Sequence, residues 1–287
     1  MLTALGGDQI ARMSAVHVRR KNLHAIVCIK SVPDTTEVRF NPETNTLMRD
    51  EVESIINPFD TYAIEEALRL KEAHGGKVTV LTMGPPKAEK ELREAVAMGC
   101  DEAIFLSARE FAGSDTWATA YTLAQAIRRI GAYDIIFCGK QAMDGDTGQV
   151  GPGVANQLEI PQLTYVFKVR EIDLEGRSIQ VERLLEEGRE VVETRLPALL
   201  TVVKDINQPR YPTFRGIRTA RRLEIPVWGA AEIEAAPQYL GLDGSPTQVI
   251  RVFTPPKREG RVEMIDGDSV DAMADALADR LLGDKVV

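Results

Sequence analysis

Residues 135–152 read Ile-Ile-Phe-Cys-Gly-Lys-Gln-Ala-Met-Asp-Gly-Asp-Thr-Gly-Gln-Val-Gly-Pro, and this stretch decides the fold. The apolar run Ile135–Cys138 is typical of a strand that is buried on both faces of a parallel sheet. Glycines then turn the chain toward a helix that we expect to begin within Thr147–Gly151. Backbone N–H groups at a helix start have no partner within the helix, and together with the helix dipole they predict a phosphate site. The alternative is an ordinary glycine turn that is capped by Asp146 or Thr147.

Apolar runs of the same kind recur upstream, separated by helix-forming segments. The further predicted strands are Ala25–Val32, Val78–Met83 and Ala103–Ser107. The predicted amphipathic helices are Thr61–Ala73, Lys87–Met98 and Ser114–Ile130, the last capped by Ser114 or Asp115. Strand–helix–strand repetition with right-handed crossovers predicts an α/β fold with a doubly wound, mostly parallel sheet. Such sheets bind ligands beyond the carboxyl ends of their strands, where the strand order reverses.

Three regions depart from this alternation. Two extended arms around a Pro/Asn turn predict a β-hairpin over Thr36–Asp50. After Leu158 the chain is β-rich, and from Gly229 it is acidic and loop-rich until a last amphipathic helix. The strands expected in the β-rich half are 164–172, 178–185, 189–196 and 199–203, and the last helix is 270–282. We therefore divide the chain into a flexible leader (1–23), a nucleotide-binding α/β domain (24–228) and an extended C-terminal arm that wraps a partner subunit (229–287).

The composition excludes several classes of protein. A formal net charge of −8 argues against a nucleic-acid binder, which usually presents a basic face. The cysteines Cys28, Cys100 and Cys138 end apolar runs and lack CxxC spacing, so we expect buried free thiols in a reducing compartment and no metal site. No apolar run reaches the roughly 18 residues of a membrane span, and no secretory signal precedes the first strand. We expect a cytoplasmic protein without a transmembrane segment.

The motifs of common catalytic classes are also missing. No GxGxxG follows the first strand and no GxxxxGK[ST] occurs, which argues against a Rossmann dehydrogenase and a P-loop NTPase. GxSxG and HExxH are absent as well. We interpret the acid pairs Glu65-Glu66 and Glu186-Glu187 as solvated faces. The sequence therefore predicts a protein that binds a nucleotide and has no catalytic residue of its own.

Several segments at the predicted strand ends form one recognisable set. They read Val27-Cys-Ile-Lys-Ser-Val-Pro-Asp, Ile56-Asn-Pro-Phe-Asp followed by Glu65-Glu-Ala-Leu-Arg-Leu-Lys, Met83-Gly-Pro-Pro, Ala97-Met-Gly-Cys-Asp, and the stretch from Gly139 to Pro152. The set resembles the beta subunit of electron-transfer flavoproteins. The resemblance covers about residues 24–225, and the tail matches only loosely.

The resemblance implies a heterodimer with an alpha subunit that carries a mobile, electron-shuttling flavin. The beta subunit of this family has an adenine-nucleotide-binding fold. It holds AMP in ordinary members and a second FAD in electron-bifurcating members. Carried onto this chain, the cofactor-binding residues are Cys28, Asn57, Pro58, Phe59, Asp60, Met83, Gly139, Lys140, Gln141, Ala142, Met143, Asp144, Gly145, Asp146, Thr147, Gly148, Gln149 and Val150. Asp144 and Asp146 are expected to cap the turn or contact sugar hydroxyls, because they would repel a phosphate.

The resemblance also implies a docking surface for a flavin-dependent dehydrogenase. The family's recognition loop matches the stretch from Pro209 to Arg222, in which a hydrophobic side chain enters a pocket of the dehydrogenase. Phe214 occupies that position, and the docking residues are Tyr211, Phe214, Arg215 and Arg218. The alternative is a basic surface helix without an anchoring role. Two positions depart from the family's pattern: Cys28 replaces a small residue, and Leu184 replaces an acid that steadies the flavin domain in mitochondrial-type members.

The choice between FAD and AMP depends on the start of the chain. Val32-Pro-Asp-Thr-Thr-Glu and the hairpin after it resemble the bifurcating members, which favours FAD over AMP. NADH would then be a substrate, with one electron passed to the alpha flavin and a dehydrogenase and the other to a low-potential acceptor such as ferredoxin. The alternative within the family is a conventional carrier with structural AMP that links an acyl-CoA-type dehydrogenase to the respiratory chain. The alternatives of another class are an ATP-binding sensor and an adenylating enzyme.

Overall fold

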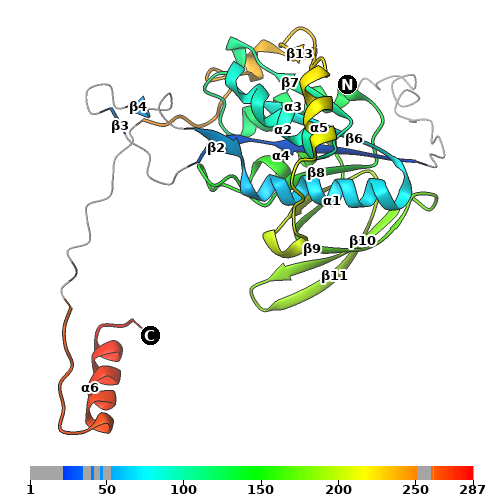
Figure 1. The fold of residues 1–287 in the computed structure, drawn as a ribbon. Helices are drawn as coiled ribbons and strands as arrows, with labels where there is room; N and C mark the ends of the chain where they lie inside the picture. The colour runs from blue at the N-terminus through cyan, green and yellow to red at the C-terminus, as the bar shows by residue number, and fades with distance from the viewer. Residues whose placement is uncertain are drawn as a thin grey trace, which may run out of the picture. The chain divides into compact units, whose positions relative to one another are not determined.

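The alternation of strands and helices builds one nine-stranded sheet with helices on both faces (Figure 1). The structure is a computed structural model, and it describes residues 22–34, 40–41, 46–47, 53–250, 260 and 262–286. From edge to edge the sheet contains β11 (Gly188–Arg195), β10 (Ser178–Leu185), β9 (Gln162–Asp173), β12 (Ala198–Val202), β8 (Ile135–Gly139), β1 (Leu23–Ile29), β6 (Gly76–Met83), β7 (Glu102–Leu106) and β13 (Val227–Trp228). The predicted α/β class is confirmed.

The pairing of these strands confirms the mostly parallel sheet. Every neighbouring pair from β13 across to β9 is parallel. The pairs β9–β10 and β10–β11 are antiparallel and extend one edge, as the alternating pattern of the β-rich half predicts. From β1 the chain first moves outward through β6 and β7, then crosses back to β8 on the other side of β1. The strand order therefore reverses between β1 and β8, and a doubly wound sheet binds ligands at such a point.

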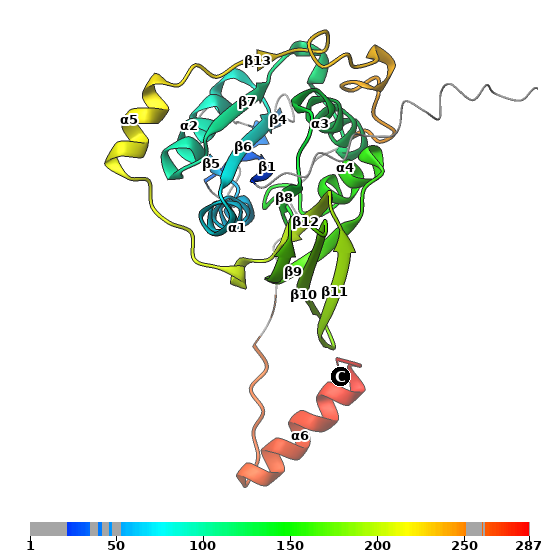
Figure 2. The same cartoon turned by 90° about the vertical axis from the view of Figure 1, so that its right-hand side faces the viewer.

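Helices cover the two faces of the sheet separately (Figure 2). Alternate residues of β1 point to opposite faces: Ala25 and Val27 pack against α1 and α2, whereas Ile26 and Cys28 pack against α3 and α4. The helices are α1 (Pro58–His74), α2 (Glu89–Met98), α3 (Thr116–Ile130), α4 (Val150–Leu158), α5 (Phe214–Arg222) and α6 (Val270–Gly283). Short 3₁₀ turns lie at Pro86–Ala88, Arg109–Phe111, Lys204–Ile206 and Pro237–Tyr239. None of the helices that the structure describes is long and apolar enough to cross a membrane.

The insertion after β1 contains two short antiparallel pairs. β2 (Ser31–Pro33) pairs with β5 (Ser54–Ile56), and β3 (Phe40–Asn41) pairs with β4 (Thr46–Leu47). The second pair lies inside the predicted hairpin 36–50, and the remaining residues of that hairpin lie outside those described. The proposed leader likewise falls on residues outside the described ranges, except for residues 22 and 23, and β1 already begins at Leu23.

The chain divides into two compact units near its C-terminal end. Residues 229–250 belong to the same compact unit as the sheet, and a second unit comprises residues 251–287. Ile233 and Leu240 are buried in the core on the α3 side, and the Tyr121 hydroxyl accepts a hydrogen bond of 3.0 Å from the N–H of Ala236. These isolated apolar residues anchor an otherwise polar segment to the first unit. Within the second unit, the Ser269 side chain caps the start of α6.

Candidate functional site

Three segments that are distant in sequence meet at the carboxyl ends of β1 and β8. They are Lys30 after β1, the start of α1, and the loop that leaves β8. Asp60, in the first turn of α1, accepts hydrogen bonds from the N–H of Lys30 (2.8 Å) and the N–H of Gly139 (3.0 Å). Its carboxylate therefore bridges the two strand ends at the point where the strand order reverses. Burial raises the pKa of Asp60 to about 7, although hydrogen bonds from Asn57, Lys30 and Gly139 oppose that shift.

The approach of α1 to β8 requires a glycine at residue 139. A Cβ on Gly139 would lie 2.4 Å from Asp60 Oδ1 and 2.6 Å from Phe59 Cβ. Asn57, which is buried just before α1, fastens the loop itself. Its amide nitrogen donates to the carbonyl of Gln141 (2.9 Å), and its amide oxygen accepts from the N–H of Met143 (3.1 Å). The predicted candidates at Asn57–Asp60 and in the β8 loop thus belong to one hydrogen-bonded group.

The two carboxylates of the loop have partners within this group. Asp144 forms an ion pair with Lys30, with an Nζ–Oδ1 distance of 2.6 Å. Asp146 accepts a hydrogen bond from the side chain of Gln141. Asp146 also adopts a left-handed conformation with φ of 55°, and its N–H donates to the carbonyl of Ala142 (2.8 Å). Asp146 therefore closes the turn, and Asp144 joins the loop to the residue that follows β1.

The end of the loop exposes backbone donors at the start of α4. Among the hydrogen bonds of the described residues, none is donated by the N–H groups of Thr147, Gly148 or Gln149. Gly148 is left-handed (φ +62°) and Gln149 right-handed (φ −98°, ψ −21°), a sequence of conformations that makes successive N–H groups converge on an anion. The N-terminal end of the α4 dipole adds to this preference for negative charge.

The other candidates lie beneath or beside this loop. Cys28 and Cys138 are buried at the ends of β1 and β8, and their thiols are hydrogen-bonded to each other. This hydrogen bond and burial raise the pKa of Cys138, so it is a neutral thiol near pH 7. All three cysteines are buried and free, which confirms the prediction of the sequence. Met83 is half-buried at the end of β6 and packs against the core on the α3 side.

Two residues at the site escaped the sequence analysis. Lys30 belongs to a segment with a recognised pattern, but its charge gave no reason to expect the pairing with Asp144. Tyr165 lies on β9 in a left-handed conformation (φ 57°), which is rare for an aromatic residue. Its ring lies 5.0 Å from the Nζ of Lys140, the one cation in the loop from Gly139 to Val150. A positive φ leaves no pattern in the sequence, so Tyr165 could not be singled out.

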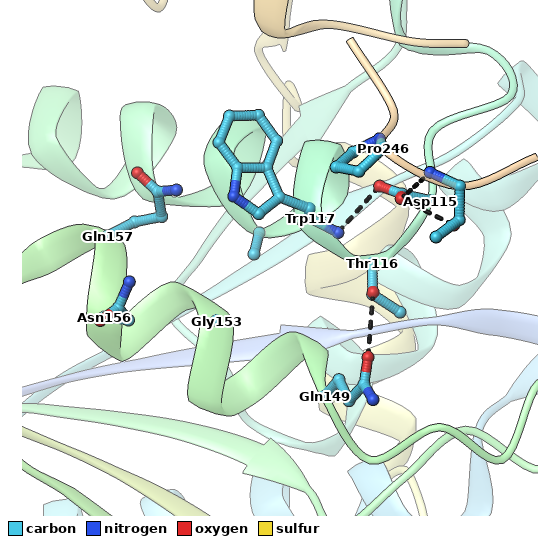
Figure 3. A pocket seen from close by; sticks show the side chains of 10 residues that line it. Asp115, Thr116, Trp117, Gln149, Gly153, Asn156, Gln157 and Pro246 are labelled. Carbon is cyan, nitrogen blue, oxygen red and sulfur yellow. Dashed lines mark hydrogen bonds between the residues drawn. The ribbon is translucent and has the colours of Figure 1, made fainter.

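A separate cavity of about 270 Å³ lies between α3 and α4 (Figure 3). Trp117 from α3 and the carboxamides of Asn156 and Gln157 from α4 line it. The Thr116 hydroxyl bonds the side-chain oxygen of Gln149 at 3.3 Å. Of the predicted cofactor-binding residues, only Gln149 borders this cavity, which makes it distinct from the loop and strand-end group described above.

The predicted docking residues lie on the opposite side of the sheet from α3 and α4. The Tyr211 and Phe214 side chains are 92% and 95% exposed, and Arg215 and Arg218 are exposed on α5. α5 is capped by the side chain of Thr213 and packs beside α2 (Figure 2). The structure thus brings together the docking candidates and keeps them apart from the nucleotide candidates.

The interpretation of Glu65 and Glu66 as a solvated pair is wrong. Both side chains are buried, because residues 204–210 cross the outer face of α1. Arg210 bonds Glu65, and Asn207 donates to Glu66 Oε2 at 3.0 Å. Burial raises the pKa of Glu66 despite that hydrogen bond. Glu186-Glu187 is exposed, as expected.

Comparison with known proteins identifies one family over most of the chain. The profile of the electron transfer flavoprotein domain matches residues 44–233. The FixA protein of Azorhizobium caulinodans is 52% identical over 260 residues, which cover 89% of this chain and 92% of the relative. The electron transfer flavoprotein subunit beta of Thermoanaerobacterium thermosaccharolyticum is 50% identical over 260 residues, with 90% and 98% coverage. The caffeyl-CoA reductase-Etf complex subunit CarD of Acetobacterium woodii is 46% identical, again with 90% and 98% coverage.

Proposed function

This chain belongs to the electron transfer flavoprotein beta-subunit family, and on that premise we propose that it binds FAD and works as a heterodimer with an alpha subunit. Electron transfer is the activity of the family. The finer assignment concerns the nucleotide that this chain holds, the source of the electrons and the proteins that receive them.

The observation that carries the assignment is the set of unpaired N–H groups at residues 147–149. Three backbone donors on one turn and the positive end of α4 fit a phosphate group of an adenine nucleotide. The loop carboxylates do not compete for these donors, because Asp144 and Asp146 have their own partners in Lys30 and Gln141. Asp60 faces inward to brace the two strands, so its contribution to a ligand is to hold the loop in place.

FAD is the nucleotide that the region after β1 favours. The segment Val32–Glu37 resembles the bifurcating members of the family, and its residues Val32 and Pro33 pair with Ile55 and Ser54, just before the Asn57–Asp60 corner. Bound FAD would supply hydride acceptance from NADH and single-electron transfer to two acceptors. The residues of this chain bind and orient the cofactor. We expect one electron to reach the flavin of the alpha subunit and then a flavin-dependent dehydrogenase, and the other to reach a ferredoxin.

The dehydrogenase would dock on α5. Phe214 is an almost fully exposed aromatic side chain at the start of this helix, and the four arginines of the helix are exposed as well. Aromatic anchors of this kind commonly contribute most of the energy of a protein interface. The basic surroundings favour a partner with an acidic rim.

The test of the nucleotide assignment is the content of the purified heterodimer. The chain is produced together with its alpha subunit, the complex is denatured, and the released nucleotides are identified and quantified by chromatography. We expect two FAD per heterodimer, and NADH should bleach both. One FAD and one AMP in a complex that does not react with NADH would refute bifurcation and place the chain among the conventional carriers.

A pair of glycine variants tests the phosphate site itself. Gly148→Ala disfavours the left-handed backbone at residue 148, which orients the exposed N–H groups. The added Cβ has space, because it would meet only the Lys140 carbonyl oxygen, at 3.4 Å. Gly131→Ala is the matched control, because Gly131 also has a positive φ (+90°) and open space around it, but lies at the end of α3. The Gly148 variant should lose nucleotide and the Gly131 variant should keep it. Full nucleotide content in both variants would rule out the proposed phosphate site at residues 147–149.

A further inference from the structure

The docking segment, which we define as residues 207–222, combines exposed side chains with a fixed backbone. Tyr211 and Phe214 are more exposed than any other aromatic side chains of the described residues. A loop with such side chains could be expected to move freely. Its backbone is instead tied to α1 at one end and to α2 at the other.

Arg210 makes the attachment to α1. Its guanidinium bonds both oxygens of Glu65, at 2.8 and 3.0 Å, and both oxygens of Glu72, at 2.5 and 3.2 Å. Its backbone N–H also donates to Glu65 (3.1 Å). Burial alone would raise the pKa of Glu65, but the hydrogen bonds from Arg210 outweigh burial and hold that pKa below its ordinary value. A planar guanidinium is suited to this double bidentate contact, whereas a lysine ammonium can act only as a point charge.

Arg93 and Gly216 make the attachment to α2. The Arg93 guanidinium donates to the carbonyl of Ala220 (2.5 Å) and to the carbonyl of Leu223 (3.3 Å). A Cβ on Gly216 would lie 2.0 Å from the carbonyl oxygen of Ala97, so α5 touches the end of α2 directly. Arg210 and Gly216 are therefore two fixed points, and the five residues between them, Tyr211 to Arg215, include both exposed aromatic residues.

The charges of the segment divide between its two sides. Arg210 is neutralised internally by Glu65 and Glu72. Within the described part of the chain, no carboxylate forms an ion pair with Arg215, Arg218, Arg221 or Arg222. The charge on the inner side of the segment is thus paired, whereas the outer side presents two exposed aromatic residues together with arginines that have no ion-pair partner among the described residues.

We propose that Arg210 is a positioning residue that preorganises the docking segment, so that Tyr211 and Phe214 are presented in one geometry to a partner with an apolar hollow and an acidic rim. The partner's identity rests on the proposed docking function, whereas the ordering of the segment by Arg210 does not. A loop whose backbone is already ordered loses less conformational entropy when a partner binds. Removing Arg210 should therefore weaken docking although its own side chain faces away from the partner.

The experiment is amide hydrogen exchange on the alpha/beta heterodimer. The reporters are the N–H groups of Arg210, Gly216 and Ile217, which are bonded to Glu65, to the Thr213 hydroxyl and to the Thr213 carbonyl. Arg210→Met keeps roughly the length of the side chain and removes its hydrogen bonds to Glu65 and Glu72. It does not leave Glu65 without a partner, because Arg69 Nε still donates to Glu65 at 3.0 Å. Arg218→Met is the control, since it removes an equal charge from the outer side.

Loss of hydrogen bonds to charged groups should raise the population of the locally opened segment by about tenfold or more, and a tenfold change corresponds to about 1.4 kcal/mol. Exchange at the three reporters should therefore accelerate by at least about tenfold in Arg210→Met and by less than about twofold in Arg218→Met. Arg210→Lys should lie between them, because an ammonium cannot bond all four oxygens. Equal exchange in Arg210→Met and the wild type would overturn the proposal. So would equal acceleration in the Arg218→Met control.

A second arm separates this inference from the docking function. Phe214→Ala should leave exchange unchanged, because its side chain is 95% exposed and ties nothing down. If that variant also transfers electrons to a purified acyl-CoA dehydrogenase at the wild-type rate, the docking role fails and the ordering by Arg210 stands. If Phe214→Ala impairs transfer but Arg210→Met leaves both exchange and transfer unchanged, docking stands and the positioning role fails.

Discussion

Replacing Asp60 by asparagine should change the pH dependence of stability in a way that identifies this residue. Burial raises the pKa of Asp60 from 3.8 to about 7. The folded state therefore holds the proton more tightly than the unfolded state does. Between pH 3.8 and about 7 folding takes up this proton, so stability falls as the pH rises through that window. The contribution of Asp60 is fully favourable only below the lower value.

The size of the effect follows from the shift. One unit of pKa difference corresponds to about 1.36 kcal/mol, so Asp60 lowers the free energy of unfolding by roughly 4 kcal/mol at pH 8 and by roughly 2 kcal/mol at pH 5. The difference between these pH values is roughly 2–3 kcal/mol. Asp60→Asn removes the titrating group, so the free energy of unfolding of the variant lacks this dependence on pH. It also turns an amide N–H toward one of the two backbone donors, which costs about 1–3 kcal/mol at every pH and does not affect the slope.

The assay is urea unfolding of the full chain at pH 5 and pH 8. We compare the wild type, Asp60→Asn and the exposed control Asp205→Asn, which removes the same charge from the surface. The gap between wild type and Asp60→Asn should shift by roughly 2–3 kcal/mol in favour of the variant as the pH rises. Carbon NMR of the Asp60 carboxyl should show a midpoint near pH 7. Parallel pH profiles, or a midpoint near the ordinary value, would refute the reasoning.

Four further outcomes are expected. Gly139→Ala should destabilise the chain by about 1–3 kcal/mol in urea unfolding, because its Cβ would overlap Asp60 and Phe59; unchanged stability would mean that α1 can retreat. Phe214→Ala should weaken binding of the dehydrogenase by about 2 kcal/mol or more without change in nucleotide content, measured by titrating the heterodimer with the purified enzyme. The difference in unfolding free energy between wild type and Arg210→Met should shrink as the pH falls below about 4. The lowered pKa of Glu65 stabilises the fold at pH values above the pKa of the unfolded chain, and this stabilisation is lost when Glu65 is protonated. A constant difference would contradict the role of the Arg210–Glu65 contact. Removing residues 251–287 should leave the unfolding free energy of the first unit unchanged and weaken its association with the alpha subunit, which sedimentation of the mixed subunits would measure.

Much of the fold is determined by local sequence. The runs that form β1, β6, β7 and β8 are apolar on both faces, because each strand lies between two layers of helices. The glycine-rich loop after β8 indicates a turn that leads into a helix, and α4 begins at Val150, within the expected range. The β9–β11 region alternates along its strands because it extends the edge of the sheet and is partly exposed, and this too is a local pattern.

The contacts between residues that are far apart in the chain were decided by the tertiary structure alone. Glu65 looked like a solvated acid because its partner Arg210 lies 145 residues away, and no pattern near either residue announces the pairing. Asp60 acquires its role as a brace only because β1 and β8, which are far apart in the chain, become neighbours in the sheet. Ile233 and Leu240 are single apolar residues in a polar stretch, and only the surface of α3 beneath them turns that stretch into part of the domain. Periodicity reports which side of an element is apolar, whereas the identity of the group that covers it depends on how the whole chain folds.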